Sequence, residues 1–266
     1  MQQMKALLAM YSLREAMQAD LTGTLERAAR LGFDGVELAW YAGHSVAEVR
    51  RAVRQLGLEV WSCHTDVREM LDGPERNFED IASLGARYVV ICHMRPEERP
   101  GGARFEQTRE DVARLSELAR TQYGLTMLYH NHDFDLQRLP DGRRSLDVSY
   151  EAFALRGELD TCWVELCGAS TVEYLQRYAG RIPLMHVKNY RRTPAPAGAP
   201  APAPGCEFCP LGWGEIDFAP ILRTAQAVGV QAAILEVDEP GCGKSALECV
   251  ELGAQKLFEL MGRTVH

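Results

Sequence analysis

Short apolar runs alternate along the chain with longer amphipathic stretches, and this alternation predicts repeated β/α units. Eight runs rich in Val, Ile, Leu and Tyr are expected to be strands: 5–11, 34–40, 58–64, 86–93, 125–131, 156–160, 181–188 and 232–238. The sixth, RGELD at 156–160, has the weakest strand character. Stretches of helical length separate the runs, so we expect parallel strands joined by helices.

The stretches between the expected strands contain helix start and stop signals. LTGTLERAARLG at 21–32 has apolar residues at helical spacing, Thr and Glu in its first turn, and Gly32 in the place of a C-cap. The same layout recurs at 45–57, and four later stretches also run into a Gly before the next strand: 79–85, 105–124, 171–180 and 218–229. We find no switch point for an open doubly wound sheet. The pattern therefore predicts an α/β fold, a closed (β/α)8 TIM barrel.

The length of 266 residues is in the range of one such barrel, so we expect 1–266 to form a single TIM-barrel domain. One segment departs from the alternation of strands and helices. The Pro/Ala-rich stretch TPAPAGAPAPAPG at 193–205 can form neither a helix nor a central strand. It is expected to be an extended, mobile loop on the active-site face, after the seventh strand. We interpret it as a tolerated insertion, with a lid anchored by LGWGEIDF as the alternative.

Composition and charge narrow the class of protein. Hydrophobic residues make up 46% and charged residues 25%, as in ordinary globular proteins. The formal charge is −8 and basic residues form no long run, which argues against nucleic acid as a partner. The N-terminal apolar stretch, interrupted by Arg14 and Glu15, is too short and polar for a signal or membrane span. Eight cysteines, mostly in apolar segments, indicate reduced thiols and a cytoplasmic location.

Polar residues close nearly every expected strand, and in a barrel these positions build the active site. Five of the seven histidines lie there, a distribution that core packing does not explain. The residues at these ends are Glu37, His64, His93, His130, His132, Asp160, His186, Lys188, Glu236 and Asp238. His, Asp and Glu supply the nitrogen and oxygen donors that Mn, Zn, Mg and Co accept, so the pattern indicates a divalent-metal site.

Seven segments resemble motifs of a known family, and they occur in the family's order along nearly the whole chain. They are YSLREA at 11–16, GFDGVELAWYAG at 32–43, YHNHDFD at 129–135, LDTCWVELCGAS at 159–170, RIPLMHVKNY at 181–190, GWGEIDFAPIL at 212–222 and ILEVDEP at 234–240. With these segments the chain resembles the xylose-isomerase-like TIM-barrel superfamily, specifically its sugar phosphate isomerases and epimerases.

The resemblance implies one bound divalent metal ion, with Asp160, His186 and Glu236 at the positions of three family ligands. The fourth ligand in many relatives is a strand-five Glu, where this chain reads His-Asn-His. Aligning the shared Asn-His pair places His130 at the Glu position, and His132, on the same side of the strand, is the alternative. Manganese is the expected ion, with Mg, Co and Zn as alternatives.

The resemblance also implies proton abstraction next to the carbonyl of a metal-chelated keto sugar or polyol. Glu236 matches one of the two Glu residues that exchange this proton in ketose epimerases, and the other is the missing strand-five Glu. We expect His132, or alternatively His130, to move the proton, and Lys188 to stabilise a developing enediolate. A rim salt bridge is the alternative for Lys188, and Asn189 departs from the Asp usual after this Lys.

Further side chains are expected to contact the substrate. They are Glu37, Trp40, His64, His93 and Trp163. Trp163, directly beyond the Asp160 motif, fits best as an apolar wall against a sugar ring, whereas packing is an equal interpretation for Trp40 and Phe134. The pair Cys206 and Cys209 lacks the second pair of a zinc ribbon and is interpreted as incidental thiols.

These features favour a metal-dependent sugar isomerase or epimerase of carbohydrate metabolism. The His at the strand-five Glu position also fits an inosose dehydratase or a 3-keto-glycoside lyase, and a non-catalytic sugar-binding barrel stays open. Abasic-site endonucleases share the barrel, but they need a larger metal cluster and a DNA-binding surface that a charge of −8 disfavours. The expected partner is a small sugar or polyol, with no nucleic acid or membrane, and a homo-oligomer is left open.

Overall fold

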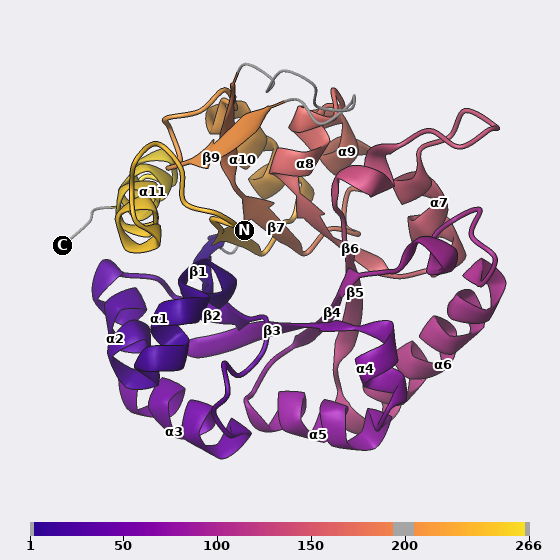
Figure 1. Ribbon diagram of the computed structural model, residues 1–266, viewed down its shortest axis with the longest axis horizontal. Helices are drawn as coiled ribbons and strands as arrows, with labels where there is room; N and C mark the ends of the chain where they lie inside the picture. Colours follow the sequence, from indigo (N-terminus) through magenta and orange to yellow (C-terminus); the bar gives the residue numbers. More distant parts are fainter. Residues whose placement is uncertain (1–2, 194–204, 264–266) are drawn as a thin grey trace.

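The computed structural model describes residues 3–193 and 205–263, and its centre is a closed barrel of eight parallel strands (Figure 1). The barrel strands are β1 (Lys5–Ala9), β2 (Gly35–Leu38), β3 (Glu59–Asp66), β4 (Tyr88–His93), β5 (Thr126–His130), β6 (Arg156–Asp160), β7 (Leu184–Val187) and β10 (Ala232–Leu235). The predicted (β/α)8 TIM barrel and its eight strands, the weak sixth included, are confirmed.

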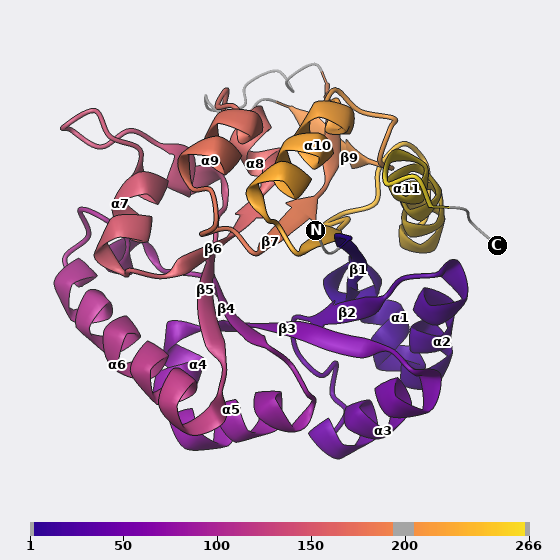
Figure 2. The same cartoon turned by 180° about the vertical axis from the view of Figure 1, so that it is seen from behind.

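Helices form an outer ring around these strands, as the front and back views show (Figure 1 and Figure 2). They are α1 (Arg14–Ala19), α2 (Leu21–Leu31), α3 (Val46–Leu56), α4 (Val67–Leu71), α5 (Pro74–Ser83), α6 (Phe105–Tyr123), α7 (Ser145–Ala152), α8 (Thr161–Leu166), α9 (Thr171–Arg177), α10 (Phe218–Val228) and α11 (Ala246–Leu260). Short 3-10 helices add η1 (Met10–Leu13), η2 (Pro96–Glu98) and η3 (Asp133–Leu136). In the described part of the chain, none of the helices has both the length and the apolar character of a membrane span.

The helix boundaries follow the signals in the sequence. Ser45 caps α3 by accepting from the backbone N–H of Glu48, whose carboxylate accepts in turn from the Ser45 backbone, a capping box. Gly32 and Gly57 end α2 and α3 with positive φ angles of 93° and 67°, which Gly adopts without steric cost. The six helices predicted from the sequence are therefore confirmed, each within a few residues except α5, which begins five residues early.

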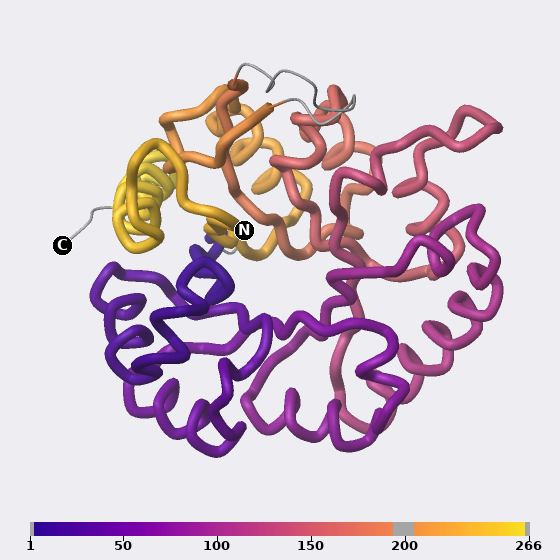
Figure 3. The backbone as a smooth tube through the Cα atoms, viewed as in Figure 1, coloured from indigo at the N-terminus to yellow at the C-terminus, as the bar shows by residue number. Residues whose placement is uncertain are grey.

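Closure of the barrel sets which strand ends become neighbours. β1 pairs with β10 along Lys5 to Leu8, so the first and last strands of the barrel meet at one seam. In the backbone tube the indigo start of the described chain lies beside its late, orange-to-yellow part (Figure 3). On the opposite side, β5 pairs with β6 with His130 opposite Glu158, and β6 pairs with β7 with Asp160 opposite His186. The register therefore places the chemistry-bearing residues of three successive strands side by side.

The barrel interior changes from apolar to polar along the strands. Leu128 of β5, Leu184 of β7 and Ile234 of β10 belong to the apolar cluster that fills the inside of the barrel. Because side chains alternate between the two faces of a strand, residues two positions further on also point inward. At these positions the chain has His130, His186 and Glu236. The core thus ends in a polar layer at the carboxyl ends of the strands.

A two-stranded hairpin after β7 was not predicted. β8 (Asn189–Arg192) pairs antiparallel with β9 (Cys206–Cys209), with Tyr190 opposite Phe208. The hairpin stands beside α8 and α10 (Figure 1), and the CxxC pair forms the ends of its second strand. Of the Pro/Ala-rich segment 193–205, residues 194–204 lie outside the described residues, so the prediction of a mobile loop stays a prediction.

We predict that Gly157→Ala destabilises β6, because a Cβ there would lie 2.3 Å from the Tyr150 hydroxyl oxygen. Both residues are fully or almost fully buried, so overpacking is expected to cost about 1–3 kcal/mol of unfolding free energy. Tyr150→Phe removes the atom in closest conflict and should restore part of the loss in the double variant. Urea denaturation measures both, and an unchanged midpoint for Gly157→Ala would contradict the packing.

Candidate functional site

Three predicted ligands meet at the carboxyl ends of β6, β7 and β10, and we call Asp160, His186 and Glu236 the outer cluster. Each contributes one donor atom to a group in which all donors lie within 4.8 Å of one another. His186 Nδ1 is 2.9 Å from Glu236 Oε2, and all three side chains are buried. One nitrogen and two carboxylate oxygens from three strands thus face a common point.

Lys188 extends its ammonium group into the outer cluster. Its Nζ lies 2.9 Å from Asp160 Oδ2, 3.1 Å from Glu236 Oε2 and 2.6 Å from Asp238 Oδ2. Burial favours the neutral amine, but the three carboxylates outweigh it and raise the pKa of Lys188 well above its ordinary value. The side chain is 2% exposed, so it is a buried ammonium group rather than a salt bridge at the rim.

The outer cluster fits a divalent cation because its donor atoms suit one and because one of its buried carboxylate oxygens accepts no hydrogen bond among the described residues. Asp160 Oδ2 is buried and, among the described residues, accepts no hydrogen bond, its partner being the Lys188 charge. Its other oxygen accepts from the backbone N–H of Trp163 and so holds the carboxylate in place at the start of α8. Lys188 also pairs with Asp238, so it keeps a carboxylate partner when a cation takes the oxygens of Asp160 and Glu236.

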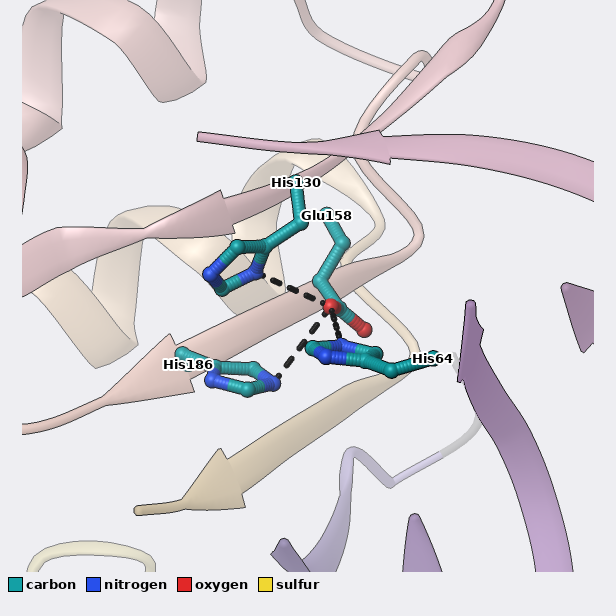
Figure 4. Close-up of side chains that lie close together, drawn as sticks. All are labelled: His64, His130, Glu158 and His186. Carbon is teal, nitrogen blue, oxygen red and sulfur yellow. Dashed lines mark hydrogen bonds and ion pairs between the residues drawn. The ribbon is translucent and has the colours of Figure 1, made fainter. Parts of the chain in front are cut away.

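His130 lies in a second group below the outer cluster, and we call His64, His130 and Glu158, together with His186, the inner cluster (Figure 4). His130 Nδ1 is 3.1 Å from Glu158 Oε2, whereas its Nε2 is 3.9 Å from Asp160 Oδ2. His64 Nε2 is 2.6 Å and His186 Nε2 is 3.4 Å from the same Glu158 oxygen. Three of the four predicted ligands therefore share the outer group, and the fourth turns toward the inner one.

Glu37, expected to contact substrate, lies instead beneath the rings of two histidines. Its Oε1 is 2.7 Å from His186 Nε2 and 3.1 Å from His64 Nε2, and its Oε2 accepts from the Ser62 hydroxyl at 2.6 Å. It is 2% exposed. Burial raises the pKa of Glu37, but His64 and His186 outweigh this and hold that pKa well below its ordinary value. Its position suits it to orient His186 rather than to contact a ligand.

The pKa values of the inner-cluster residues are shifted in different directions. Burial, with Glu37 nearby, raises the pKa of Glu158 to about 7, although His186 and His64 oppose the shift. Burial and then His186 lower the pKa of His130 well below its ordinary value. The pKa of His64 is raised well above its ordinary value, because the attraction of Glu37 and Glu158 exceeds the effect of burial. His130 is accordingly neutral at pH 7, the state in which an imidazole binds metal.

His132 and Trp163 line the mouth above the clusters. Burial and then Lys188 lower the pKa of His132 to about 3, so the ring is neutral and a weak base in the free protein. Its ring stacks on Phe134 at 5.5 Å and lies 6.1 Å from that of Trp163. Lys188 Nζ is 4.8 Å from the centre of the Trp163 ring. Phe208 of the hairpin packs edge-on against Trp163 at 5.7 Å, and it adds an aromatic wall that the sequence did not indicate.

Two expected substrate contacts lie further out. Trp40 is 48% exposed and packs edge-on against Tyr11 at 5.3 Å. His93 is exposed at the end of β4, with Phe134 as its aromatic neighbour at 6.2 Å. A cleft of about 360 Å³ is lined by Trp40 and by His64, so it connects the rim with the inner cluster on the β2 and β3 side. The structure brings neither Trp40 nor His93 into either cluster.

Glu158 is the member of the site that sequence reasoning missed. In the segment RGELD the sequence assigns a role to the last residue, Asp160, and gives none to Glu158. The signal was present, because residues two apart on a strand point to the same face. Asp238 was noted at a strand end, but its pairing with Lys188 comes from the structure.

Comparisons with known proteins agree with this architecture. The family model described as xylose isomerase-like TIM barrel matches residues 25–252, which confirms the resemblance seen in the sequence. No curated protein matches the chain in sequence.

Solved structures share the fold at low identity. A sugar phosphate isomerase/epimerase from Parabacteroides distasonis superimposes with a TM-score of 0.80 at 18% identity, covering 96% of this chain and 97% of that chain. The probable 3-DHS dehydratase AsbF from Bacillus anthracis gives 0.72 at 17% identity, covering 96% and 98%. The IolI protein with a bound zinc atom gives 0.68 at 15% identity, covering 97% and 98%. By its family match over most of its length, this chain belongs to the xylose isomerase-like TIM-barrel family.

Proposed function

We propose that this protein is a divalent-metal-dependent enzyme that isomerises or epimerises a keto sugar or polyol by moving a proton next to a carbonyl. The observation that carries the proposal is the outer cluster, where Asp160, His186 and Glu236 present metal donors beside the buried ammonium of Lys188. The family match and the likeness to an isomerase/epimerase support the reaction class.

Asp160, His186 and Glu236 would hold the ion, with manganese as the proposed metal. These residues offer one nitrogen and two oxygens, a mixed set that Mn, Zn and Co accept. When bound there, the ion supplies Lewis-acid polarisation of a substrate carbonyl. Glu37 supports the ligand set from below, because its carboxylate accepts from His186 Nε2 and leaves the lone pair of Nδ1 toward Glu236.

The protein's own residues can move the proton and stabilise the resulting charge. Burial raises the pKa of Glu236, but Lys188 and His186 outweigh this and keep the pKa below its ordinary value, so Glu236 is an ionised proton acceptor. Lys188 would neutralise an enediolate oxygen at the same place. His132, neutral and with its Nδ1 unpaired among the described residues, would return a proton by giving up its ring N–H hydrogen while the other ring nitrogen takes one up. Trp163 and Phe208 would exclude water from the sugar face.

A dehydratase or lyase is the second candidate, because it begins with the same proton abstraction. The replacement of the strand-five Glu by His130 favours it, since a two-Glu epimerase mechanism lacks its second Glu here. The likeness to a probable 3-DHS dehydratase supports this alternative as strongly as the other supports epimerisation. A non-catalytic sugar-binding barrel would use the same mouth without proton transfer.

A panel of keto sugars incubated with the metal-loaded protein in deuterated water should separate these functions. We expect deuterium incorporation next to the carbonyl of at least one sugar, detected by NMR or mass spectrometry, because each proposed reaction begins with removal of that proton. Product analysis then distinguishes an epimer from a dehydrated compound. Binding of sugars without exchange would reject the enzyme and leave the sugar-binding barrel.

Asp160→Asn should abolish the exchange and lower the metal content by about one equivalent, since the ion loses a charged ligand. The fold should persist, because an amide oxygen can still accept from the Trp163 N–H that begins α8. Circular dichroism tests the fold, and elemental analysis the metal. Exchange at the wild-type rate in this variant would rule out the outer cluster as the active site.

Lys188→Met, similar in length but uncharged, tests whether the ammonium group acts on the substrate. We expect kcat to fall by about 10²- to 10³-fold with the outer ion retained, because a preorganised charge beside the enediolate is lost. A mere counter-ion of Asp160 and Glu236 would leave kcat unchanged once metal saturates the site. Steady-state kcat and KM at saturating metal decide between the two roles.

A further inference from the structure

Three imidazole nitrogens converge on a single carboxylate oxygen in the inner cluster (Figure 4). His64 Nε2, His130 Nδ1 and His186 Nε2 lie 2.6, 3.1 and 3.4 Å from Glu158 Oε2. The rings are packed closely, with centroids 5.0 Å apart for His64 and His130 and 4.7 Å apart for His130 and His186. Each of these four residues offers one ligand atom to a group in which all such atoms lie within 4.8 Å of one another.

The spacing of these donors is close to that of a tetrahedral zinc site. Zinc bonds to nitrogen and oxygen are about 2.1 Å long, which places neighbouring tetrahedral ligands about 3.4 Å apart. The 3.1 Å distance from His130 to Glu158 agrees with this within a few tenths of an ångström. The His64 distance has to open by about 0.8 Å, within reach of a side-chain adjustment.

One of the two carboxylate oxygens of Glu158 has no hydrogen-bond partner among the described residues. That oxygen is Oε1, and the side chain is fully buried. A buried carboxylate without full pairing costs free energy, and a metal ion is one of the few groups that remove this cost. Gly157 and Leu159, its neighbours on β6, are apolar, so the cluster itself must supply the compensation.

The charge of the two clusters together points to two cations. Five carboxylates, those of Glu37, Glu158, Asp160, Glu236 and Asp238, stand in the described site with the ammonium of Lys188. With neutral histidines, the state in which they would bind metal, five carboxylates and one ammonium group leave an excess of four negative charges. One divalent ion halves this excess, and two remove it. Lys188 pairs with the outer carboxylates and not with Glu158 in the described structure, so Glu158 would have only the ion as its cationic partner once the histidines are neutral.

Both clusters can bind a metal ion at the same time, because His186 serves the outer cluster and His130 serves the inner one. His186 turns Nδ1 to the outer cluster, and its Nε2–H then donates to Glu37 at 2.7 Å. His130 turns Nδ1 to Glu158, with Nε2 left 3.9 Å from Asp160. Each cluster therefore keeps three ligands of its own without requiring an imidazole to bind two metals.

We propose that His64, His130 and Glu158 form a second metal site, nitrogen-rich and suited to zinc or cobalt, directly beneath the outer cluster. Two imidazoles and one carboxylate select a borderline transition metal over Mg or Ca, which prefer all-oxygen sites. The existence of this site does not depend on the reaction proposed above.

Metal content of the full-length protein tests the second site directly. The chelator-stripped protein is equilibrated with Zn²⁺, dialysed and measured by elemental analysis. We expect about two equivalents for the wild type and about one for each of His64→Asn, Glu158→Gln and Asp160→Asn, because each variant loses a ligand of one site. The double variant His64→Asn with Asp160→Asn should hold about none. His93→Asn, a strand-end histidine outside both clusters, serves as the matched control and should keep about two.

Cobalt spectra locate the ion that remains. Co²⁺ in the inner site should give visible absorption in Asp160→Asn that is lost in the double variant, and Zn²⁺ should raise the melting temperature of Asp160→Asn but not of the double variant. If Glu158→Gln does not fold, as circular dichroism shows, His64→Asn and the wild-type stoichiometry still decide.

The outcomes separate this site from the proposed function. A wild type that binds one equivalent, lost in Asp160→Asn and retained in His64→Asn, overturns the inner site and leaves the outer one standing. Two equivalents that fall to one in His64→Asn, in a protein that exchanges no sugar proton, support the inner site and reject the enzyme. Retention of both equivalents in His64→Asn and Glu158→Gln also overturns the inner site.

Discussion

Four buried carboxylates and a fifth that is largely buried lie at one end of an otherwise apolar barrel, and their mutual repulsion constrains the rest of the site. Such groups are costly to bury unless each finds a cation or a hydrogen-bond donor. Lys188 meets part of this demand through three contacts, and His186 meets another part by facing Glu236 with one nitrogen and Glu37 with the other. The orientations of Lys188 and His186 follow from this need for compensation.

The burial of these groups also explains their strongly shifted pKa values. The site stands on a closely packed apolar layer of the barrel interior. The apolar layer formed by residues such as Leu128, Leu184 and Ile234 excludes water beneath the clusters, so burial acts strongly on the groups above it. It raises the pKa of Glu158 to about 7 and contributes to lowering that of His132 to about 3. Groups held on strands also move little, which suits a site that must fix the geometry of a small substrate.

The family supplies the framework of this site, and the chain's own residues change its detail. The family model matches residues 25–252, a range that includes Asp160, His186 and Glu236. On β5, where the family resemblance leads us to expect Glu, the chain has His130, whose Nδ1 faces Glu158 on the neighbouring strand. On the proposal above, His130 and Glu158 together with His64 add a second metal position to the first.

The sequence by itself determined the eight barrel strands, six of the helices and the polar character of the strand ends, because these depend on periodicity and caps that neighbouring residues define. It also identified Asp160, His186 and Glu236, whose strand-end positions the register then brought together. It could not determine that His130 turns to Glu158, that Lys188 enters the outer cluster, or that 189–192 pairs with 206–209. These contacts join residues on different strands or across a long connection, so they are set by barrel closure and by strand register. Periodicity fixes which face of a strand a side chain occupies, whereas only the folded barrel decides which charge it meets there.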